Sequence, residues 1–375
     1  MKFACDKAAL CEAVNSVSPA VSAKSTLVAL ECILLSISGN TLSVIGYNTE
    51  LGITKTLEVS SSESGDVILN ARLFSEIINK MPSGMVQISV DEKLLTLITG
   101  GSAQFTIIGM SAEEYPEIPK IDPEHSFAIE NAMLRNMISE TLFAVSQDTA
   151  FPALTGTLFE GKNGVLYLVS VDGKRLALRK EQVGCTEDFR FIVPGKTLSE
   201  FLKLSSRFVS EREDGSLPVS IGVGSRHILF SCCGFTMVSR LLEGDFIDYT
   251  VAIPGEGTTE AIVSTRAFME SISRASIIIS EKVKNPIRAM FDSSGIEVSC
   301  ETGLGKIDDR ITAKITGEPV RIGFNDRYMM DALKASGEDE VRLELGSTLS
   351  PIKIMPLEGD SFTFLVMPMR LKDDR

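Results

Sequence analysis

Two histidines are the residues best suited to acid–base or metal chemistry near neutral pH, and they are the only ones in the chain. A catalytic triad combines histidine with a nucleophile and an acid, and a typical zinc site needs several ligands. His125 follows Pro123 closely and is expected in a linker, whereas His227 is expected in a strand. Neither residue predicts an active site.

Paired acids and thiols are the other reactive groups. Glu113-Glu114 and Asp308-Asp309 could supply an acid and a base, but such pairs in loops are more often solvated charge. The seven cysteines are scattered, and the adjacent Cys232-Cys233 pair would point to opposite faces of a strand. We expect buried or incidental thiols, with neither a disulfide framework nor a zinc site.

Motifs for nucleotide and hydrolase chemistry are missing from the sequence. No G-x-x-x-x-G-K-[ST], G-x-G-x-x-G or G-x-S-x-G motif opens a helix. The sequence therefore predicts no catalytic residue, cofactor or metal. An enzyme whose site is assembled across domains remains an alternative, because such a site leaves no local motif.

A basic residue recurs at one position of a repeated helical pattern. Arg72, Lys196 and Arg327 occupy this position. Taken singly, each would be an ordinary exposed charge. If the helices lie along one surface, however, the three residues form a positive stripe that suits phosphate groups, whose contacts carry no sequence information. Further candidates for DNA contact are Lys24, Lys80, Gln147, Lys203 and Lys282.

The helical pattern occurs three times, at domain-sized intervals. Its copies begin at Asn70, Pro194 and Asn325, and each places apolar residues at spacing i, i+3, i+4, which predicts an amphipathic helix. These apolar positions are Phe74, Ile77 and Ile78; Leu198, Phe201 and Leu202; and Met329, Ala332 and Leu333. An acid also recurs, as Glu76, Glu200 and Asp331.

The other elements recur in the same order. Earlier helices are expected over residues 6–17, about 130–145 and about 264–276, each after a short strand. Hairpins follow, with turns at Gly39-Asn40, Asn163-Gly164 and Ser294-Gly295. Segments rich in proline or glycine, 115–125 and 252–260, predict linkers. We therefore expect three α+β domains over residues 1–121, 122–254 and 255–375, each with two helices against antiparallel sheet.

The composition indicates a globular protein with an acidic exterior. The chain has 375 residues, 44% of them hydrophobic, and a net charge of −13. Such a net charge argues against a protein that coats DNA nonspecifically. It is still compatible with a protein that has an acidic exterior and binds DNA in a basic channel. The N-terminus lacks the apolar run of a signal peptide, and no later run reaches the length of a membrane span. A cytoplasmic location and no membrane partner are expected.

Four segments resemble the beta subunit of bacterial DNA polymerase III, the replicative sliding clamp. They are MKFACDKAAL at the start, VDGKRLAL from Val171, EGDFIDY from Glu243 and LVMPMRL near the end. The resemblance covers the whole chain. It implies a non-enzymatic processivity factor in which each subunit is half of a closed ring, and two subunits join head to tail around duplex DNA.

The resemblance also implies two protein-binding surfaces. A dimer interface would involve Phe105, Ile277 and Ile278, although each could equally be core. A hydrophobic pocket would receive short peptides of the polymerase, the clamp loader and repair proteins. Its lining would be Leu154, Val171, Gly173, Lys174, Arg175, Leu176, Ile247, Val251, Pro351, Val366, Met367, Pro368, Met369 and Arg370.

The sequence departs from the family's pattern in this pocket. Lys174 replaces a usual histidine, Ile247 a proline and Val251 a common arginine, so partner preference is expected to differ. The chain also continues past the usual terminal leucine as Lys372–Arg375, a tail that could reach the pocket. A multidomain adaptor that binds peptides but not DNA is a further alternative, which charge reversal at the three repeated basic positions would distinguish.

Overall fold

The computed structural model describes residues 1–375 except residue 186 and residues 208–216, 280–284 and 372–375. These residues form two compact units. One comprises residues 1–132 with 199–241, and the other residues 133–198 with 242–375. Among the described residues, no helix is long and apolar enough to cross a membrane.

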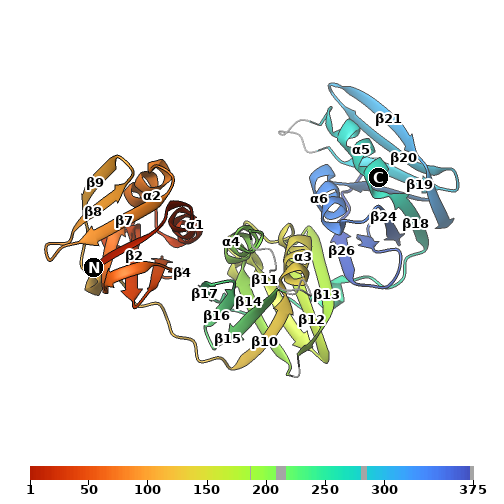
Figure 1. Ribbon diagram of the computed structural model, residues 1–375. Coiled ribbons are helices and arrows are strands. Elements are labelled where there is room, and N and C mark those ends of the chain that lie inside the picture. The colour runs from red at the N-terminus through yellow and green to blue at the C-terminus, as the bar shows by residue number, and fades with distance from the viewer. Residues whose placement is uncertain (186, 208–216, 280–284, 372–375) are drawn as a thin grey trace. The chain divides into compact units, whose positions relative to one another are not determined.

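The expected order of strand, helix, strands, helix, strands occurs three times (Figure 1). The first copy consists of β1 (Lys2–Asp6), α1 (Lys7–Val17), β2 (Cys32–Ser38), β3 (Thr41–Tyr47), β4 (Leu51–Glu58), β5 (Ser60–Glu63), β6 (Gly65–Asn70), α2 (Ala71–Lys80), β7 (Met85–Val90), β8 (Leu95–Gly100) and β9 (Ala103–Ile108).

The second and third copies repeat this order. The second consists of β10 (His125–Glu130), α3 (Asn131–Leu142), β11 (Gly156–Lys162), β12 (Gly164–Val171), β13 (Arg175–Cys185), β14 (Phe189–Pro194), α4 (Gly195–Ser205), β15 (Pro218–Val223), β16 (His227–Cys232) and β17 (Phe235–Arg240). The third consists of β18 (Thr259–Ser264), α5 (Thr265–Ser276), β19 (Ile287–Asp292), β20 (Gly295–Thr302), β21 (Gly305–Ile311), β22 (Ala313–Gly317), β23 (Val320–Phe324), α6 (Asp326–Ser336), β24 (Glu340–Leu345), β25 (Ile352–Met355) and β26 (Phe362–Val366).

Short polar side chains fix where several of these helices begin. The Asn70 side-chain oxygen accepts a hydrogen bond from the Leu73 amide at 3.0 Å, and Asn325 does the same for Tyr328 at 3.1 Å. Such caps satisfy amides that have no partner inside the helix. The equivalent helices α2 and α6 therefore start at equivalent residues, as the sequence pattern predicts.

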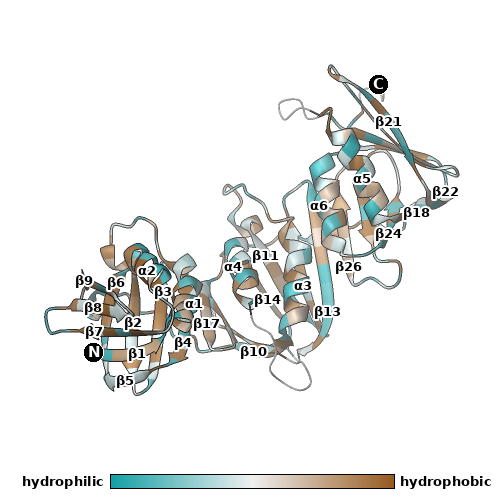
Figure 2. Ribbon diagram, turned by 45° about the horizontal axis from the view of Figure 1, so that its top comes forward, coloured by the Kyte–Doolittle hydropathy of each residue, from teal (hydrophilic) through white to brown (hydrophobic). Residues whose placement is uncertain are grey.

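Each predicted amphipathic helix buries its apolar face. Alternating apolar and polar bands are visible on α5 and α6 in Figure 2, and these two helices pack together. Of the nine repeated apolar positions, all are buried except Leu202, which is half-buried. The prediction of three equivalent core-facing helices is confirmed.

Antiparallel sheets supply the other layer of each unit. The first unit contains a five-stranded sheet, ordered β5-β1-β7-β8-β9, and an eight-stranded sheet in which β4 pairs with β17. The second unit contains a four-stranded sheet, β21-β20-β19-β23, and a nine-stranded sheet in which β13 pairs with β26. Strands from adjacent copies thus share a sheet within each unit. The α+β class with antiparallel sheet is confirmed.

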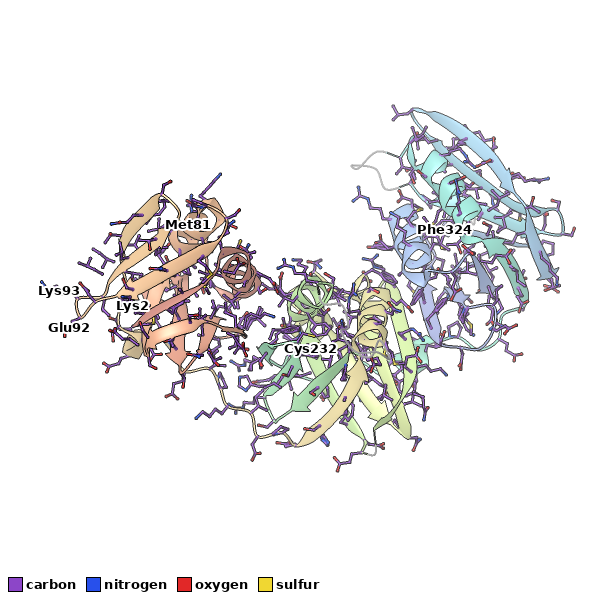
Figure 3. The ribbon with its side chains drawn as sticks, viewed as in Figure 1. Lys2, Met81, Glu92, Lys93, Cys232 and Phe324 are labelled. Atoms are coloured by element: carbon purple, nitrogen blue, oxygen red, sulfur yellow. The ribbon has the colours of Figure 1, made fainter. Side chains whose placement is uncertain are left out.

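Turns at the predicted hairpins adopt left-handed backbone conformations. Gly39, Asn163, Gly164 and Gly295 all have positive φ. A further hairpin, β7–β8, carries Glu92 and Lys93 at its exposed tip (Figure 3).

Some local expectations were wrong. His125 does not lie in the linker but begins β10, where it pairs with Val223. Asp308-Asp309 lies in strand β21 rather than a loop. Cys232 and Cys233 do not share a strand, because β16 ends at Cys232. For His125 and Cys233 the end of a strand differs by one residue from the pattern, whereas strand β21 was not expected at all.

Candidate functional site

The three recurring basic residues occupy equivalent places in the structure. Arg72, Lys196 and Arg327 are each the second residue of their helices α2, α4 and α6, and all three are exposed. The Arg72 Nε atom lies 3.1 Å from Glu76 Oε1, and both side chains are largely in solvent. Exposed pairs of this kind contribute little to stability, so the guanidinium can exchange its partner for a phosphate at small cost.

The remaining candidates for DNA contact are also on the surface where the structure describes them. Lys24, Lys80, Gln147 and Lys203 are exposed. The Lys203 ammonium lies 2.7 Å from Glu200 of the same helix. Lys282 lies outside the described residues.

The candidate dimer residues differ in exposure. Phe105 lies on β9, the edge strand of the five-stranded sheet, and is 39% exposed. On the same strand Ile108 is 78% exposed, and the sequence reasoning did not select it. Ile277 follows α5 and is 79% exposed, whereas Ile278 packs partly against the core. An exposed apolar edge strand is suited to pairing with another chain.

The candidate peptide pocket is built around the turn between β12 and β13. The Asp172 carboxylate accepts hydrogen bonds from the amides of Lys174 and Arg175 at 2.8 and 2.9 Å, and Gly173 has φ 80°. The Met367 amide donates to the Lys174 carbonyl at 2.9 Å. The two segments that the resemblance joins, 171–176 and 366–370, therefore lie side by side.

Apolar side chains from four segments meet at this turn. Val171 and Leu176 share a cluster with Leu365, Phe246 and Tyr249, and Leu154 packs against it. The sequence reasoning did not select Phe246 and Tyr249, although both lie in the EGDFIDY segment that carries the resemblance. The cluster forms a continuous apolar base.

The rim of this cluster is exposed. Ile247 and Met367 are each 41% exposed, and Val251 is 82% exposed. Gly173, Lys174 and Arg370 are also exposed, while Pro351, Pro368 and Met369 are half-buried. Val366 instead lies within the separate core of the C-terminal repeat, where it is fully buried. The tail 372–375 lies outside the described residues.

Arg175 is held by groups of its own chain. Its guanidinium lies 2.9 Å from Asp172 and 2.6 Å from Asp331, and it stacks 4.6 Å from the Tyr328 ring centroid. Its side chain is only 13% exposed. Tyr328 and Asp331 belong to α6, so Arg175 connects the candidate pocket to the third repeat. We infer a positioning role for Arg175 rather than a ligand contact.

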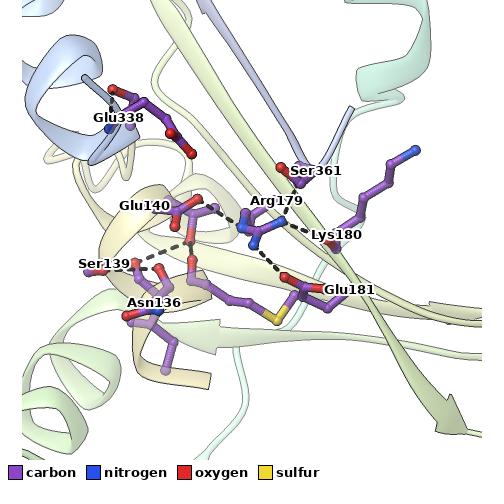
Figure 4. Close-up of polar contacts among 12 residues, drawn as sticks. Asn136, Ser139, Glu140, Arg179, Lys180, Glu181, Glu338 and Ser361 are labelled. Carbon is purple, nitrogen blue, oxygen red and sulfur yellow. Dashed lines mark hydrogen bonds and ion pairs between the residues drawn. The ribbon is translucent and has the colours of Figure 1, made fainter. Parts of the chain in front are cut away.

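Arg179, a second arginine on β13, lies among several acidic side chains (Figure 4). Arg179 Nε is 2.8 Å from Glu140 Oε2, and Arg179 also pairs with Glu181 and donates to the Ser361 carbonyl at 2.8 Å. Burial is the main cause that raises the pKa of Glu140 to about 7; the charge of Arg179 opposes this rise, and the charges of Glu181 and Glu338 add to it. The cluster joins α3 and β13 to the segment that precedes β26.

No arrangement suited to catalysis is evident in the described part of the chain. There, no group of three or more His, Cys, Asp or Glu side chains is placed to hold a metal ion. Burial, aided by Arg240 and Arg226, lowers the pKa of His227, which favours its neutral form. Asp308 lies 2.8 Å from Lys306, and Asp309 pairs with Arg274. These acids are therefore engaged in ion pairs.

Comparison with known proteins supplies the context for these surfaces. Residues 1–119, 128–248 and 250–370 match family models of the N-terminal, central and C-terminal domains of the DNA polymerase III beta subunit. A beta sliding clamp of Bacillus subtilis is 33% identical over 383 residues, covering 99% of this chain and 100% of the relative.

Solved structures agree over the whole chain. The DNA polymerase sliding clamp of Bacillus subtilis matches with a TM-score of 0.93 at 32% identity, covering 99% of both chains. A sliding clamp of Pseudomonas aeruginosa, solved bound to griselimycin, matches with a TM-score of 0.92 at 27% identity, covering 99% of this chain and 100% of that one.

Three tandem copies of one α+β unit, together with these likenesses, define the class of DNA sliding clamps. The chain belongs to the family of the DNA polymerase III beta subunit, the beta sliding clamps of bacterial DNA replication.

Proposed function

We propose that two copies of this chain close head to tail into a ring that encircles duplex DNA and makes the replicative polymerase processive. Its domains are residues 1–121, 122–254 and 255–375. The observation that carries this proposal is the exposed basic residue at the second position of α2, α4 and α6. A repeated cation on a repeated helix supports contact with the regular phosphate backbone rather than with base edges.

The acidic net charge of −13 supports this mode of binding. A protein that holds DNA by affinity needs many cations to displace counterions. A closed ring stays on DNA by topology, so a weakly attractive interior is enough, and weak attraction permits sliding. An acidic exterior also suppresses binding of DNA elsewhere.

The exposed apolar edge of β9 supports the subunit contact. Phe105 and Ile108 would meet residues at the end of α5, including Ile277 and Ile278, on the partner subunit. Head-to-tail contacts build a ring where the rotation between subunits closes and an open filament where it does not, and six similar domains allow the rotation to close after two subunits.

The apolar cluster beneath the β12–β13 turn supports peptide docking. Ile247, Val251 and Met367 give an exposed apolar rim above buried Val171 and Leu176. Flexible methionine adapts to different apolar partners, which suits a site shared by a polymerase, a clamp loader and repair proteins. We further propose that the protein is an accessory subunit without catalytic activity of its own.

Charge reversal tests the proposed DNA-binding role. The test variant carries Arg72→Glu, Lys196→Glu and Arg327→Glu. A control with the same net charge carries Lys93→Glu, Lys162→Glu and Arg226→Glu, all at exposed positions in or beside hairpin turns. Processive synthesis on a primed circle, with polymerase and clamp loader of the source organism, should fall more than about tenfold for the test variant only. Equal activity of the two variants, with both folded, would refute the assignment.

A further inference from the structure

The turn between β16 and β17 places Cys233 in a backbone conformation that other residue types adopt more readily. Cys232 pairs with Phe235, so Cys233 and Gly234 form a two-residue turn. Their φ angles are 49° and 71°, as in a type I′ turn, which prefers asparagine and glycine. A side chain at such a φ costs on the order of 1 kcal/mol. Backbone strain of this kind often marks a functional position.

This turn brings two sulfur atoms together. The Sγ atoms of Cys232 and Cys233 are 3.3 Å apart, although the sequence predicted opposite faces of a strand. Cys233 is exposed and Cys232 is buried (Figure 3 labels Cys232). The half-buried Cys11 thiol, by contrast, donates to Asn79 Oδ1 at 2.8 Å. The vicinal pair therefore combines an accessible thiol with a second thiol already in contact.

The same turn is fastened to strand β4 of the N-terminal repeat. The Cys233 carbonyl accepts a hydrogen bond from Lys55 Nζ at 2.9 Å. The Gly234 carbonyl accepts one from the Thr56 amide at 3.0 Å and another from Thr56 Oγ1 at 3.3 Å. These bonds depend on the direction of the two turn carbonyls. A change in the conformation of the Cys232–Cys233 peptide would therefore disturb hydrogen bonds in the sheet that joins the N-terminal and central repeats.

We propose that Cys232 and Cys233 form a reversible oxidation site, at which a peroxide converts the two thiols to a vicinal disulfide and releases the turn from β4. The Cys233 sulfur attacks one peroxide oxygen, the O–O bond breaks, and a sulfenic acid and one water form. The Cys232 sulfur then attacks the Cys233 sulfur. The S–S bond forms, the S–O bond breaks, and hydroxide leaves with the Cys232 proton as a second water. This site is independent of DNA and peptide binding.

The order of attack follows from the environments of the two sulfurs. Burial raises the pKa of the Cys232 thiol, and its contact with Cys233 raises it further. Cys232 therefore stays protonated while the exposed Cys233 meets the oxidant. Adjacent Cα atoms are about 3.8 Å apart, closer than the roughly 4.4–6.8 Å of ordinary disulfides, so the bond is strained and easily reduced. These properties suit a switch rather than a structural crosslink.

Intact and peptide mass spectrometry tests the chemistry. The full-length protein is treated with hydrogen peroxide, its remaining thiols are alkylated, and the peptide containing both cysteines is measured. Loss of two hydrogens, restored by dithiothreitol, is expected in the wild type and in Cys11→Ser, but not in Cys233→Ser. Because Cys233 is exposed, its serine variant is expected to fold. Addition of oxygen to Cys233 without a disulfide would overturn the proposal. Oxidation of Cys11 while Cys232 and Cys233 stay unreacted would also overturn it.

Hydrogen exchange tests the structural consequence. The Thr56 amide should exchange about tenfold faster in the oxidised wild type, because its hydrogen bond to the Gly234 carbonyl is lost. The rate in peroxide-treated Cys233→Ser should stay at that of the untreated variant. A disulfide that forms without change at Thr56 would show that oxidation does not release the turn.

Discussion

Replacement of Glu140 by glutamine should remove a pH-dependent loss of stability. Glu140 and Arg179 are mostly buried, with 16% and 13% of their side chains exposed, and their charged atoms are 2.8 Å apart. Arg179 retains Glu181 as a partner in the Glu140→Gln variant, so its charge is not left alone. The substitution therefore tests how the negative charge of Glu140 affects stability, and it does not leave Arg179 without an ion-pair partner.

The size of the effect follows from the raised pKa of Glu140, which is about 7 instead of 4.5. The folded state holds the Glu140 proton at a pH where the unfolded state has released it. Stability must therefore fall as the pH rises from about 5 to about 7.5. At about 1.4 kcal/mol per pKa unit, with allowance for solvent screening, the full cost above pH 7.5 is about 2 to 3 kcal/mol.

Chemical and thermal unfolding at pH 5 to 8 measures this effect, and exchange of β13 amides gives a local readout. Glu140→Gln should match the wild type near pH 5 and exceed its stability by about 2 to 3 kcal/mol at pH 8. The control Glu76→Gln breaks an exposed pair and should change stability by less than about 0.5 kcal/mol. Parallel pH curves for Glu140→Gln and wild type, or lower stability of Glu140→Gln at pH 8, would contradict a raised pKa of Glu140 in the folded protein.

Substitutions at three other sites test the remaining surfaces. Arg175→Ala should cost about 3 kcal/mol in urea unfolding, because it leaves the half-buried Asp172 and Asp331 unpaired; Arg175→Lys should not restore this, since lysine cannot stack on Tyr328. A wild-type unfolding curve for either would contradict the positioning role. Met367→Ala should weaken binding of an apolar peptide about tenfold by fluorescence polarisation, whereas Leu304→Ala, also exposed, should not. Phe105→Asp with Ile108→Asp should reduce the mass in solution from twice 40.7 kDa to 40.7 kDa, and an unchanged mass would rule out β9 as the interface.

The threefold repeat and the helices could be predicted because their determinants are local. Apolar spacing defines one face of each helix, and residues such as Asn70 and Asn325 mark the start. The order of the elements then follows from repetition of the same signals. The three basic positions were found in this way, as exposed second residues of equivalent helices.

Contacts between distant segments, apart from those that the resemblance supplied, could not be predicted. Nothing near Arg175 in the sequence indicates that Tyr328 and Asp331 surround its guanidinium. The charges that act on Glu140 likewise come from distant parts of the sequence, namely Arg179 and Glu181 on β13 and Glu338 after α6. Alternation misplaced Cys233 because it assumes a continuous strand, whereas a positive φ ends β16 one residue earlier. Burial and electrostatic environment require the tertiary structure.

Retention on circular and on linear DNA is the most direct test of whether the protein encircles the duplex. The protein is loaded onto a nicked circular plasmid, freed of unbound protein by gel filtration, and divided into samples with and without a single restriction cut. The protein should remain on the intact circle and be lost after the cut, because only topology holds an acidic ring on DNA. Equal loss from both samples, or equal retention on both, would contradict encirclement.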